Sequence, residues 1–214
     1  MNVVLLGAAG AGKGTQAAKL VEAHGLTHIS TGDIFRRNVA EGTPLGMEAK
    51  RYMDAGTLLP DSVVIAMVKD RLRESDCDGG FMLDGFPRTL PQAEALDEAL
   101  DSMGKKLDGV VSIEVPRDVL VSRLTSRRQC RGCGRIYNTH GQMPAVAEVC
   151  DSCGKEVYQR DDDSTEAVVK RLDDYDGITS QLIPYYASQG LLHRIDGNRA
   201  IDAVFADVQA ALEA

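Results

Sequence analysis

The sequence predicts an α/β fold in which a parallel sheet forms the core and helices cover both of its faces. Short apolar runs rich in Val, Leu and Ile, at residues 2–6 and 110–115, are typical of strands that are buried on both sides. Stretches with apolar residues at helical spacing alternate with these runs along the chain. A glycine-rich turn follows the first run directly and leads into such a helical stretch. Together these observations indicate a doubly wound architecture.

The elements of this fold are expected in a regular order. Strands are expected at residues 2–6, 28–30, 81–84, 110–115 and 191–195, and helices at 16–24, 64–72, 91–103, 117–127, 168–178 and 201–212. Asp61 is expected to cap the second of these helices, and Asp163 with Glu166 resembles a capping box. Pro184 is expected to end or kink the helix that precedes it.

Two segments interrupt the alternation of strands and helices. Residues 31–59 have helical character with no strand between the helical stretches. Residues 126–163 contain two cysteine pairs and four glycines and show little helical periodicity. We interpret both segments as insertions into the core fold.

The composition is typical of a soluble globular protein, since 43% of the 214 residues are hydrophobic and 26% are charged. This length suits one domain with insertions or two small domains. No apolar run is long enough to cross a bilayer and no basic leader precedes the first strand, so we expect a cytoplasmic protein without a membrane partner. The net charge of −8 argues against attraction of the whole surface to nucleic acid. Any anionic ligand therefore requires a local basic site.

The stretch GAAGAGKGT after the first strand resembles a phosphate-binding loop. Gly7, Gly12 and Lys13 match the pattern G-x-x-x-x-G-K, but Gly14 follows the lysine and Thr15 comes one place late. A glycine-rich turn between a strand and a helix directs backbone N–H groups and the positive helix end toward one point. The stretch therefore favours a phosphate-binding loop rather than a plain glycine-rich turn, but it does not indicate which reaction the protein catalyses.

The segment LDGFPRT places Asp84 at the end of an expected strand and Arg88 after a tight turn. Ligands of parallel sheets bind at this edge, so both side chains should face the phosphate loop, where Asp84 could orient a metal-bound water. Arg123 and Arg127 are four residues apart on an expected helix, which fits either a polyphosphate site or an ordinary solvated face. Phosphoryl transfer requires mainly positioning and cations, and no nucleophilic side-chain constellation is evident.

Two C-x2-C pairs separated by 16 residues match the spacing of structural zinc sites. The ligands would be Cys130, Cys133, Cys150 and Cys153, and His140 is a weaker candidate. Disulfides or free thiols are the alternatives. The adjoining stretch SRRQCRGCGR is basic, so a nucleic-acid-binding ribbon must be considered, although the acidic run RDDD and the negative net charge oppose it.

The chain resembles adenylate kinases of the long-lid form, whose lid carries a zinc site. The resemblance is carried by GAAGAGKGTQA, ISTGDIFR, MDAGTLLPD, GFMLDGFPRT, PQAEAL, GRIY, QRDDD and VVKRLDDY, which together span nearly the whole chain. The order K-G-T is that family's own form of the loop. The resemblance implies the reversible reaction ATP + AMP ⇌ 2 ADP with Mg²⁺, structural Zn²⁺ and a monomeric enzyme without nucleic-acid partners. It also implies a P-loop core of residues 1–29, 60–125 and 164–214, an AMP-binding domain at 30–59 and a lid at 126–163.

The resemblance also implies roles for individual residues. The ATP-binding residues would be Gly10, Ala11, Gly12, Lys13, Gly14, Thr15, Arg123, Arg127, Ile136, Tyr137 and Arg199, the last through its backbone carbonyl. The AMP-binding residues would be Thr31, Arg36, Thr57, Leu58, Leu59, Gly85, Phe86, Pro87, Arg88, Gln92, Arg160 and Arg171, with Gln92 reading adenine. The catalytic cations would be Lys13, Arg88, Arg127, Arg160 and Arg171, and Asp33 and Asp84 would act on Mg²⁺ through water. Asp162 and Asp163 would be structural.

One residue departs from the family pattern, because Ala9 stands where the family loop usually has proline. Two other functions stay open on the sequence alone. One is a kinase for another nucleoside monophosphate, and the other is a nucleotide-responsive zinc protein that binds nucleic acid.

Overall fold

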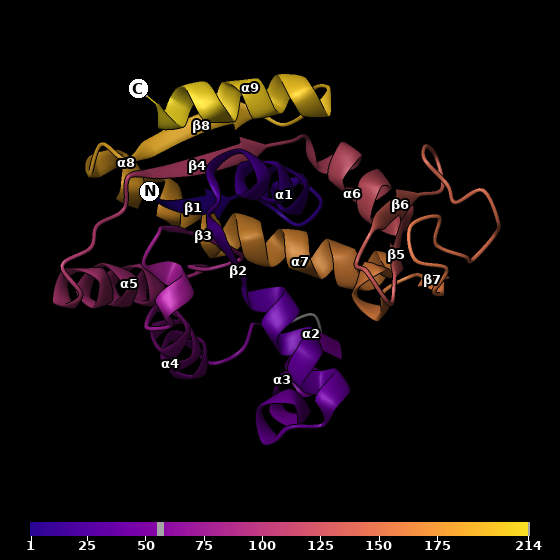
Figure 1. Ribbon diagram of the computed structural model, residues 1–214, viewed down its shortest axis with the longest axis horizontal. Helices are drawn as coiled ribbons and strands as arrows, with labels where there is room; N and C mark the ends of the chain where they lie inside the picture. Colours follow the sequence, from indigo (N-terminus) through magenta and orange to yellow (C-terminus); the bar gives the residue numbers. More distant parts are fainter. Residues whose placement is uncertain (55–57, 214) are drawn as a thin grey trace.

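The computed structural model describes residues 1–54 and 58–213, and within them a parallel sheet forms the centre of the molecule (Figure 1). Its strands are β1 (Asn2–Leu6), β2 (Thr27–Ser30), β3 (Phe81–Asp84), β4 (Gly109–Glu114) and β8 (Leu192–Asp196). They pair in the order β2-β3-β1-β4-β8, every pair parallel. Because β1 lies at the centre, the loop that follows it opens at the middle of the sheet's carboxyl edge. The predicted fold class is confirmed.

Helices cover both faces of the sheet. One face carries α1 (Lys13–His24), α6 (Arg117–Thr125), α7 (Thr165–Gly177) and α9 (Ile201–Leu212), and the other carries α4 (Asp61–Leu72), α5 (Leu90–Ser102) and α8 (Leu182–Ser188). Short 3-10 turns occur at Ser75–Cys77, Asp161–Asp163 and Thr179–Gln181. In β1, Val3 and Leu5 pack toward the first face, whereas Val4 and Leu6 pack toward the second. This alternation buries the strand on both sides, which explains its continuous apolar sequence.

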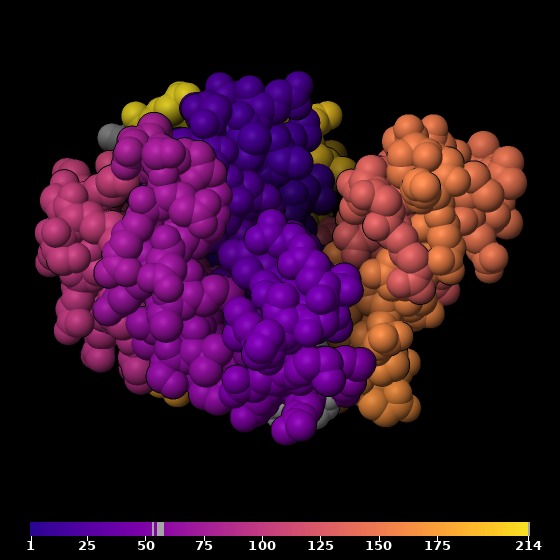
Figure 2. All heavy atoms as spheres, turned by 60° about the horizontal axis from the view of Figure 1, so that its bottom comes forward, coloured from indigo at the N-terminus to yellow at the C-terminus, as the bar shows by residue number. Residues whose placement is uncertain are grey.

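Two segments project from the core on the side of the sheet's carboxyl edge (Figure 1). The first contains α2 (Thr31–Glu41) and α3 (Pro44–Asp54), which pack against each other. The second contains β5 (Arg127–Cys130), β6 (Ile136–Asn138) and β7 (Val157–Tyr158), paired antiparallel in the order β6-β5-β7. Figure 2 shows this second segment, in orange, standing out from the body with a hollow between it and the N-terminal part in indigo.

The expected helix at 117–127 is two residues too long. α6 ends at Thr125, and Arg127 begins β5. The Arg127 guanidinium forms two hydrogen bonds to the buried carboxylate of Asp163. Arg123 and Arg127 therefore do not share a helix face, and the expectation that both lie on one helix is wrong.

The expected caps at Asp61 and Asp163 are also wrong. Pro60 is the N-cap of α4, and the Asp61 carboxylate accepts hydrogen bonds from α5 instead. Ser164 caps α7 by accepting from the N–H of Ala167. In both places the carboxylate that the local sequence pattern predicted as a helix cap instead accepts hydrogen bonds from residues distant in sequence.

Pro184 does not end the preceding helix. α7 already ends at Gly177, and Pro184 is the third residue of α8. The first N–H groups of a helix have no partner within it, so proline is tolerated there. Among the described residues, no helix has both the length and the apolar character needed to cross a membrane.

Candidate active site

A cavity of about 570 Å³ opens at the carboxyl edge of the sheet, within the usual size range of ligand sites. The ends of β1, β2 and β3 meet there, because Asp84 is in register with both Leu5 and Ser30. The wall includes the glycine-rich loop, the start of α2, the end of α6, strands β5 and β6, and the loop before α9. This cavity lies at the edge of the sheet where the sequence predicted a ligand site.

The glycine-rich loop has backbone geometry that only glycine adopts readily. Gly10 and Gly12 have φ angles of 82° and 103°. A Cβ on Gly10 would also lie 2.9 Å from Cγ of Leu124, so no side chain fits. α1 starts at Lys13, three residues earlier than predicted, which brings its positive end directly to the cavity.

Lys13 lies on the floor of this cavity and is half-buried. Its Nζ donates to the carbonyl oxygens of Gly7 at 2.8 Å and Ala8 at 3.1 Å. Burial lowers the pKa of Lys13 to about 8, against the opposing effect of Asp84 and with help from nearby arginines. A phosphate at the loop would raise the pKa of Lys13 again, so the half-buried ammonium group favours binding of an anion.

Arginines from separate elements surround the same space. Burial lowers the pKa of Arg88 to about 10, with Arg171 the next contributor. Burial also lowers the pKa of Arg160 to about 10, with Arg36 next. These groups raise each other's electrostatic energy, and a polyanion between them would relieve it. In a chain of net charge −8, this is the local basic site that the sequence required.

Acidic and amide side chains hold these arginines in place. Asp163, which is fully buried, accepts from Arg127 Nε at 2.8 Å. Asp162 accepts from Arg171 through its backbone oxygen at 2.9 Å and pairs with it through Oδ2 at 3.0 Å. Arg160 donates to the Gln129 side chain, a partner that sequence reasoning missed because no motif contains it.

Asp84 ends β3 beside the phosphate loop. A Cβ on Gly14 would lie 3.9 Å from its carboxylate, and His28 Nε2 lies 3.5 Å from Oδ2. Burial alone would raise the pKa of Asp84, but His28 and Lys13 hold it below its usual range. The sequence pattern gives no sign of this position of His28, which only the pairing of β2 with β3 reveals.

Oxygen ligands suited to Mg²⁺ line the cavity. Asp84 and Asp33, which carry carboxylates, and Thr15, which carries a hydroxyl, are among the residues that line it. Hard oxygen donors next to a phosphate loop are what Mg²⁺ with a nucleotide prefers, so these residues fit that ion. Asp33 also forms an ion pair with Arg36, which lowers the pKa of Asp33 although burial acts to raise it.

A second cavity of about 170 Å³ adjoins the first on the side of α2. Apolar side chains of Phe35, Leu59 and Val64 form part of its wall, a composition suited to a flat base. The predicted residues that line it are Thr31, Arg36, Leu58, Leu59, Gly85, Pro87, Arg88, Gln92 and Arg171. Phe86 is buried in the core beneath the turn. Thr57 lies outside the described residues.

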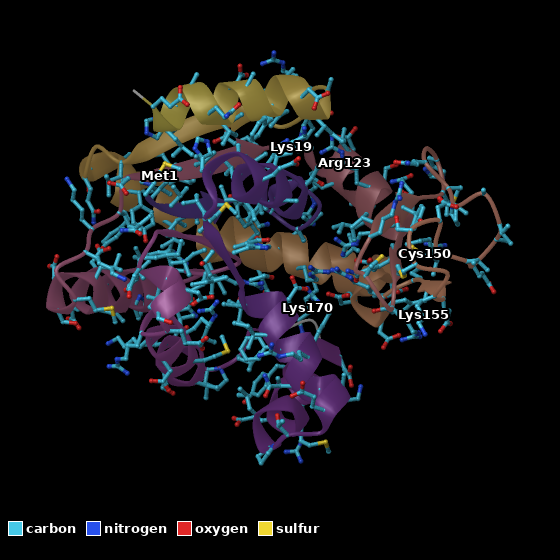
Figure 3. The ribbon with its side chains drawn as sticks, viewed as in Figure 1. Met1, Lys19, Arg123, Cys150, Lys155 and Lys170 are labelled. Carbon is cyan, nitrogen blue, oxygen red and sulfur yellow. The ribbon has the colours of Figure 1, made fainter. Side chains whose placement is uncertain are left out.

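The predicted ATP-side residues lie on the far wall of the larger cavity. Arg123, labelled in Figure 3, donates to the Gly197 carbonyl oxygen at 3.2 Å. Ile136 is 46% exposed, as an apolar surface for a base would be. Arg199 also lines this cavity, and its side chain pairs with Asp207.

Tyr137 lines the same cavity, but its side chain is 1% exposed and directed into the projecting segment. Its hydroxyl donates to Cys150 Sγ at 3.4 Å and accepts from the Asp151 N–H at 2.9 Å. The hydrogen bond from Tyr137 is the main factor that lowers the pKa of Cys150 to about 6. Tyr137 therefore connects the cavity wall to the cysteine cluster.

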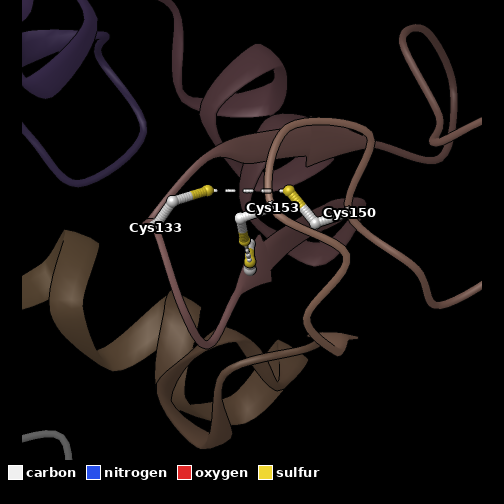
Figure 4. A group of neighbouring side chains, drawn as sticks. Cys133, Cys150 and Cys153 are labelled. Atoms are coloured by element: carbon white, nitrogen blue, oxygen red, sulfur yellow. Dashed lines mark hydrogen bonds between the residues drawn. The ribbon is translucent and has the colours of Figure 1, made fainter.

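The four predicted cysteines come together, with all Sγ atoms within 4.8 Å of one another. Figure 4 shows Cys133 facing Cys150 at 3.6 Å, and Cys130 lies 3.4 Å from Cys153. A tetrahedron with metal–sulfur bonds of about 2.3 Å has edges of roughly 3.8 Å. These separations fit a metal and are too long for disulfide bonds of about 2.05 Å. His140 is not part of the cluster among the described residues.

Comparisons with known proteins agree with this geometry. The sequence model of the adenylate kinase family matches residues 5–191. The chain is 56% identical to the adenylate kinase of Carboxydothermus hydrogenoformans over 213 residues, covering 100% of both chains. It is 53% identical to that of Methanosarcina mazei, covering 99% of this chain and 98% of the relative. It is 51% identical to that of Archaeoglobus fulgidus, covering 100% and 98% respectively.

Proposed function

The chain belongs to the adenylate kinase family of phosphotransferases, and on that premise we propose how its cleft performs the reaction ATP + AMP ⇌ 2 ADP. One observation carries the proposal: the larger and the smaller cavity share a wall that contains Lys13, Arg36, Arg88 and Arg171. A nucleotide in each cavity would bring its phosphates to this wall. The cations would then surround the phosphoryl group as it passes between the two nucleotides.

The side chains act by position and charge. The loop from Gly10 to Thr15 and Lys13 hold the phosphates of ATP, while Arg88 and Arg171 hold the accepting phosphate in line with them. Arg127 and Arg160 complete the ring of charge from the lid side. Preorganised cations of this kind stabilise the charge that develops on the transferred group. No covalent intermediate with a side chain is needed.

Each projecting segment contributes to the binding of one of the two nucleotides. We assign residues 30–59 to AMP, because Thr31 and Arg36 at the start of α2 line the smaller cavity. We assign residues 126–163 to a lid over ATP, because Ile136 and Tyr137 line the larger one. Closure of such a lid excludes water, which would otherwise accept the phosphoryl group.

Two metals have separate roles in this proposal. Mg²⁺ bound with ATP supplies positive charge to the phosphates, and Asp33 and Asp84 would hold its waters. Zn²⁺ would bind Cys130, Cys133, Cys150 and Cys153, a closed set of thiolates without a position for substrate. The cytoplasmic location and the monomeric state stay predictions.

The lid surface supports a kinase more than a nucleic-acid binder. Arg131 pairs with Glu156 and lies over the ring of Tyr158 at 3.9 Å. Arg135 donates to Ser152. These basic groups are thus already engaged within the lid.

A coupled assay of ADP formation from ATP with AMP, CMP, UMP or GMP tests the proposal. We expect AMP to be the best acceptor by a wide margin, because the smaller cavity offers an apolar slot with a single carboxamide, Gln92. A preference for another monophosphate would refute the assignment. A shift of random RNA or DNA in gels without turnover would favour the nucleic-acid alternative.

A further inference from the structure

The carboxamide of Gln92 is held at both ends. Its Oε1 accepts from the backbone N–H of Arg88 at 2.8 Å, and its Nε2 donates to Asp61 Oδ1 at 2.6 Å. The residue is 2% exposed, and it lines the smaller cavity. The two groups that hold the Gln92 side chain therefore decide how it faces a ligand.

Both of these partners act in one direction only. A backbone N–H can only donate, and an ionised carboxylate can only accept. If the Gln92 amide turned over, its NH₂ would face the Arg88 N–H and its oxygen would face the Asp61 carboxylate. Each contact would then be repulsive, so the network fixes the orientation of an amide that is otherwise ambiguous.

The fixed amide retains one lone pair on Oε1 and one N–H on Nε2. Among the described residues, no further hydrogen bond of this amide is present. An acceptor beside a donor complements the 6-amino group and an adjacent ring nitrogen of adenine, on either edge of the base. A 6-oxopurine presents an oxygen in place of the amino group, so it would meet the same amide with mismatched partners.

Asp61 is itself fixed from outside the cavity. It is the first residue of α4, and its Oδ2 accepts from Thr89 Oγ1 at 2.9 Å. Thr89 caps α5 by accepting from the N–H of Gln92. Asp61 is not among the residues that line the cavity, and its hydrogen bond to Gln92 connects it to the place of a bound base.

We propose that Asp61 is a positioning residue that makes the monophosphate site selective for 6-aminopurines over 6-oxopurines by locking the Gln92 amide. The fixed amide not only forms favourable hydrogen bonds with a 6-aminopurine but also disfavours a 6-oxopurine. The Gln92 amide cannot turn over to offer the oxopurine matching hydrogen-bond partners. This inference rests on the proposed placement of AMP in the smaller cavity.

The test compares AMP with inosine 5′-monophosphate, which carries a 6-oxo group and a proton on N1, in the full-length protein. Asp61→Asn preserves shape but offers Gln92 either an acceptor or a donor, so the amide can turn. We expect the ratio of kcat/KM for AMP to that for inosine monophosphate to fall by about tenfold or more, the scale of one charge-assisted hydrogen bond. AMP stays preferred, because the Arg88 N–H still favours the original orientation.

A second variant guards against misfolding of the first. Asp61→Ser replaces the carboxylate with a hydroxyl, which can both donate and accept, at the first residue of α4. We expect the same fall in the ratio. If both folded variants lose activity with the two substrates equally, so that the ratio stays within about twofold of the original, the lock is refuted.

Thr89→Val is the matched control. It removes the other partner of Asp61 and the cap of α5, but it leaves the bond between Asp61 and Gln92. We expect a lower melting temperature with an unchanged substrate ratio; an equal fall in the ratio would show that loosening alone causes it, and would overturn the proposal. The unaltered protein distinguishes failure of the lock from failure of the proposed function. If the unaltered protein does not prefer AMP, the proposed adenylate kinase function itself is refuted.

Discussion

The cleft and the lid are built by different physical means. The cleft groups lie on the ends of strands and helices whose apolar side chains form large buried clusters on both sheet faces. Among the described residues, the lid's own buried cluster consists of Cys130, Tyr137, Cys150 and Val157. Half of that cluster is cysteine, and so small a core cannot hold a fold by hydrophobic burial alone. Hydrophobic packing positions the cleft, whereas in our proposal metal ligation by the cysteines holds the lid together.

The cleft and the lid also differ in the surroundings of their cations. Cleft cations such as Lys13, Arg88 and Arg160 have lowered pKa values because they are buried near one another. Lid cations are satisfied locally, as Arg131 is by Glu156. The cleft, including Arg160 where the lid faces it, thus carries cations that a polyanion would stabilise, whereas lid cations outside the cleft, such as Arg131, already have partners. Substitutions in the two regions should therefore affect different measurements.

The largest effect is expected from Lys13→Met, which keeps the length of the side chain and removes its charge. We expect kcat to fall on the order of 10²–10³-fold, as on loss of one preorganised charge in an active site. Stability should be unchanged or higher, because a partly desolvated cation is removed. Steady-state kinetics and thermal unfolding check both parts.

Lys19→Met is the matched control on the same helix. Lys19 pairs with Asp202 and lies over the Phe205 ring, and it is not among the residues that line either cavity. It should retain the kcat of the unaltered protein. A loss of activity equal to that of Lys13→Met would mean that the helix, not the charge in the cleft, is responsible.

Removal of the lid metal is expected to act on stability. For a chain of this size, a loss of about 3 kcal/mol lowers the melting temperature by roughly 6–12 °C. Calorimetry before and after chelation, with metal analysis of both samples, measures the effect. Chelation of a Cys130→Ser variant should lower its melting temperature little further, because the metal site is already disrupted. An unchanged melting temperature in the metal-free protein would contradict the role given to the cysteines.

The pKa of Lys13 predicts a pH effect confined to the cleft. The lysine is charged below about pH 8 and loses its proton above it. We expect kcat/KM for ATP to fall about tenfold per pH unit above that value, since this parameter reports the free enzyme. Bound phosphates raise the lysine pKa, so kcat should decline only at higher pH.

Lys13→Arg provides the control for this pH profile, because arginine keeps its proton throughout the range. The kcat/KM of Lys13→Arg for ATP should be lower than that of the unaltered protein, but it should not change with pH over this range. The same decline in Lys13→Arg would assign the titration to another group.

The smallest effect is expected from Ala9→Pro, which restores the usual family residue. Proline restricts the unfolded chain, so we expect a gain of about 0.4–1 kcal/mol in the free energy of unfolding with little change in kcat. Denaturant unfolding measures it. Loss of stability would indicate that the loop at Ala9 does not accept the proline geometry.

The sequence predicts most of the framework and much of the cleft. Buried apolar runs identified the central strands, because a strand covered on both faces has few polar positions. The cysteine spacing likewise predicted the cluster, since ligand geometry limits the separation of paired knuckles.

Contacts between distant polar groups could not be predicted in this way. Asp61 was expected to cap its own helix, but it binds Gln92, 31 residues away. Arg127 was expected on a helix, but its pairing with the buried Asp163 accompanies a strand. Helical and strand periodicity report which face is apolar, and they carry no information on which charged groups meet.

The most direct test of the separation between cleft and lid is the turnover of Cys130→Ser, freed of metal, at a temperature below its own unfolding. If the metal only stabilises the lid, ADP formation from ATP and AMP should stay within a few-fold of the unaltered protein, while the melting temperature is clearly lower. Loss of turnover with unchanged circular dichroism would contradict this and would place the metal in the chemistry.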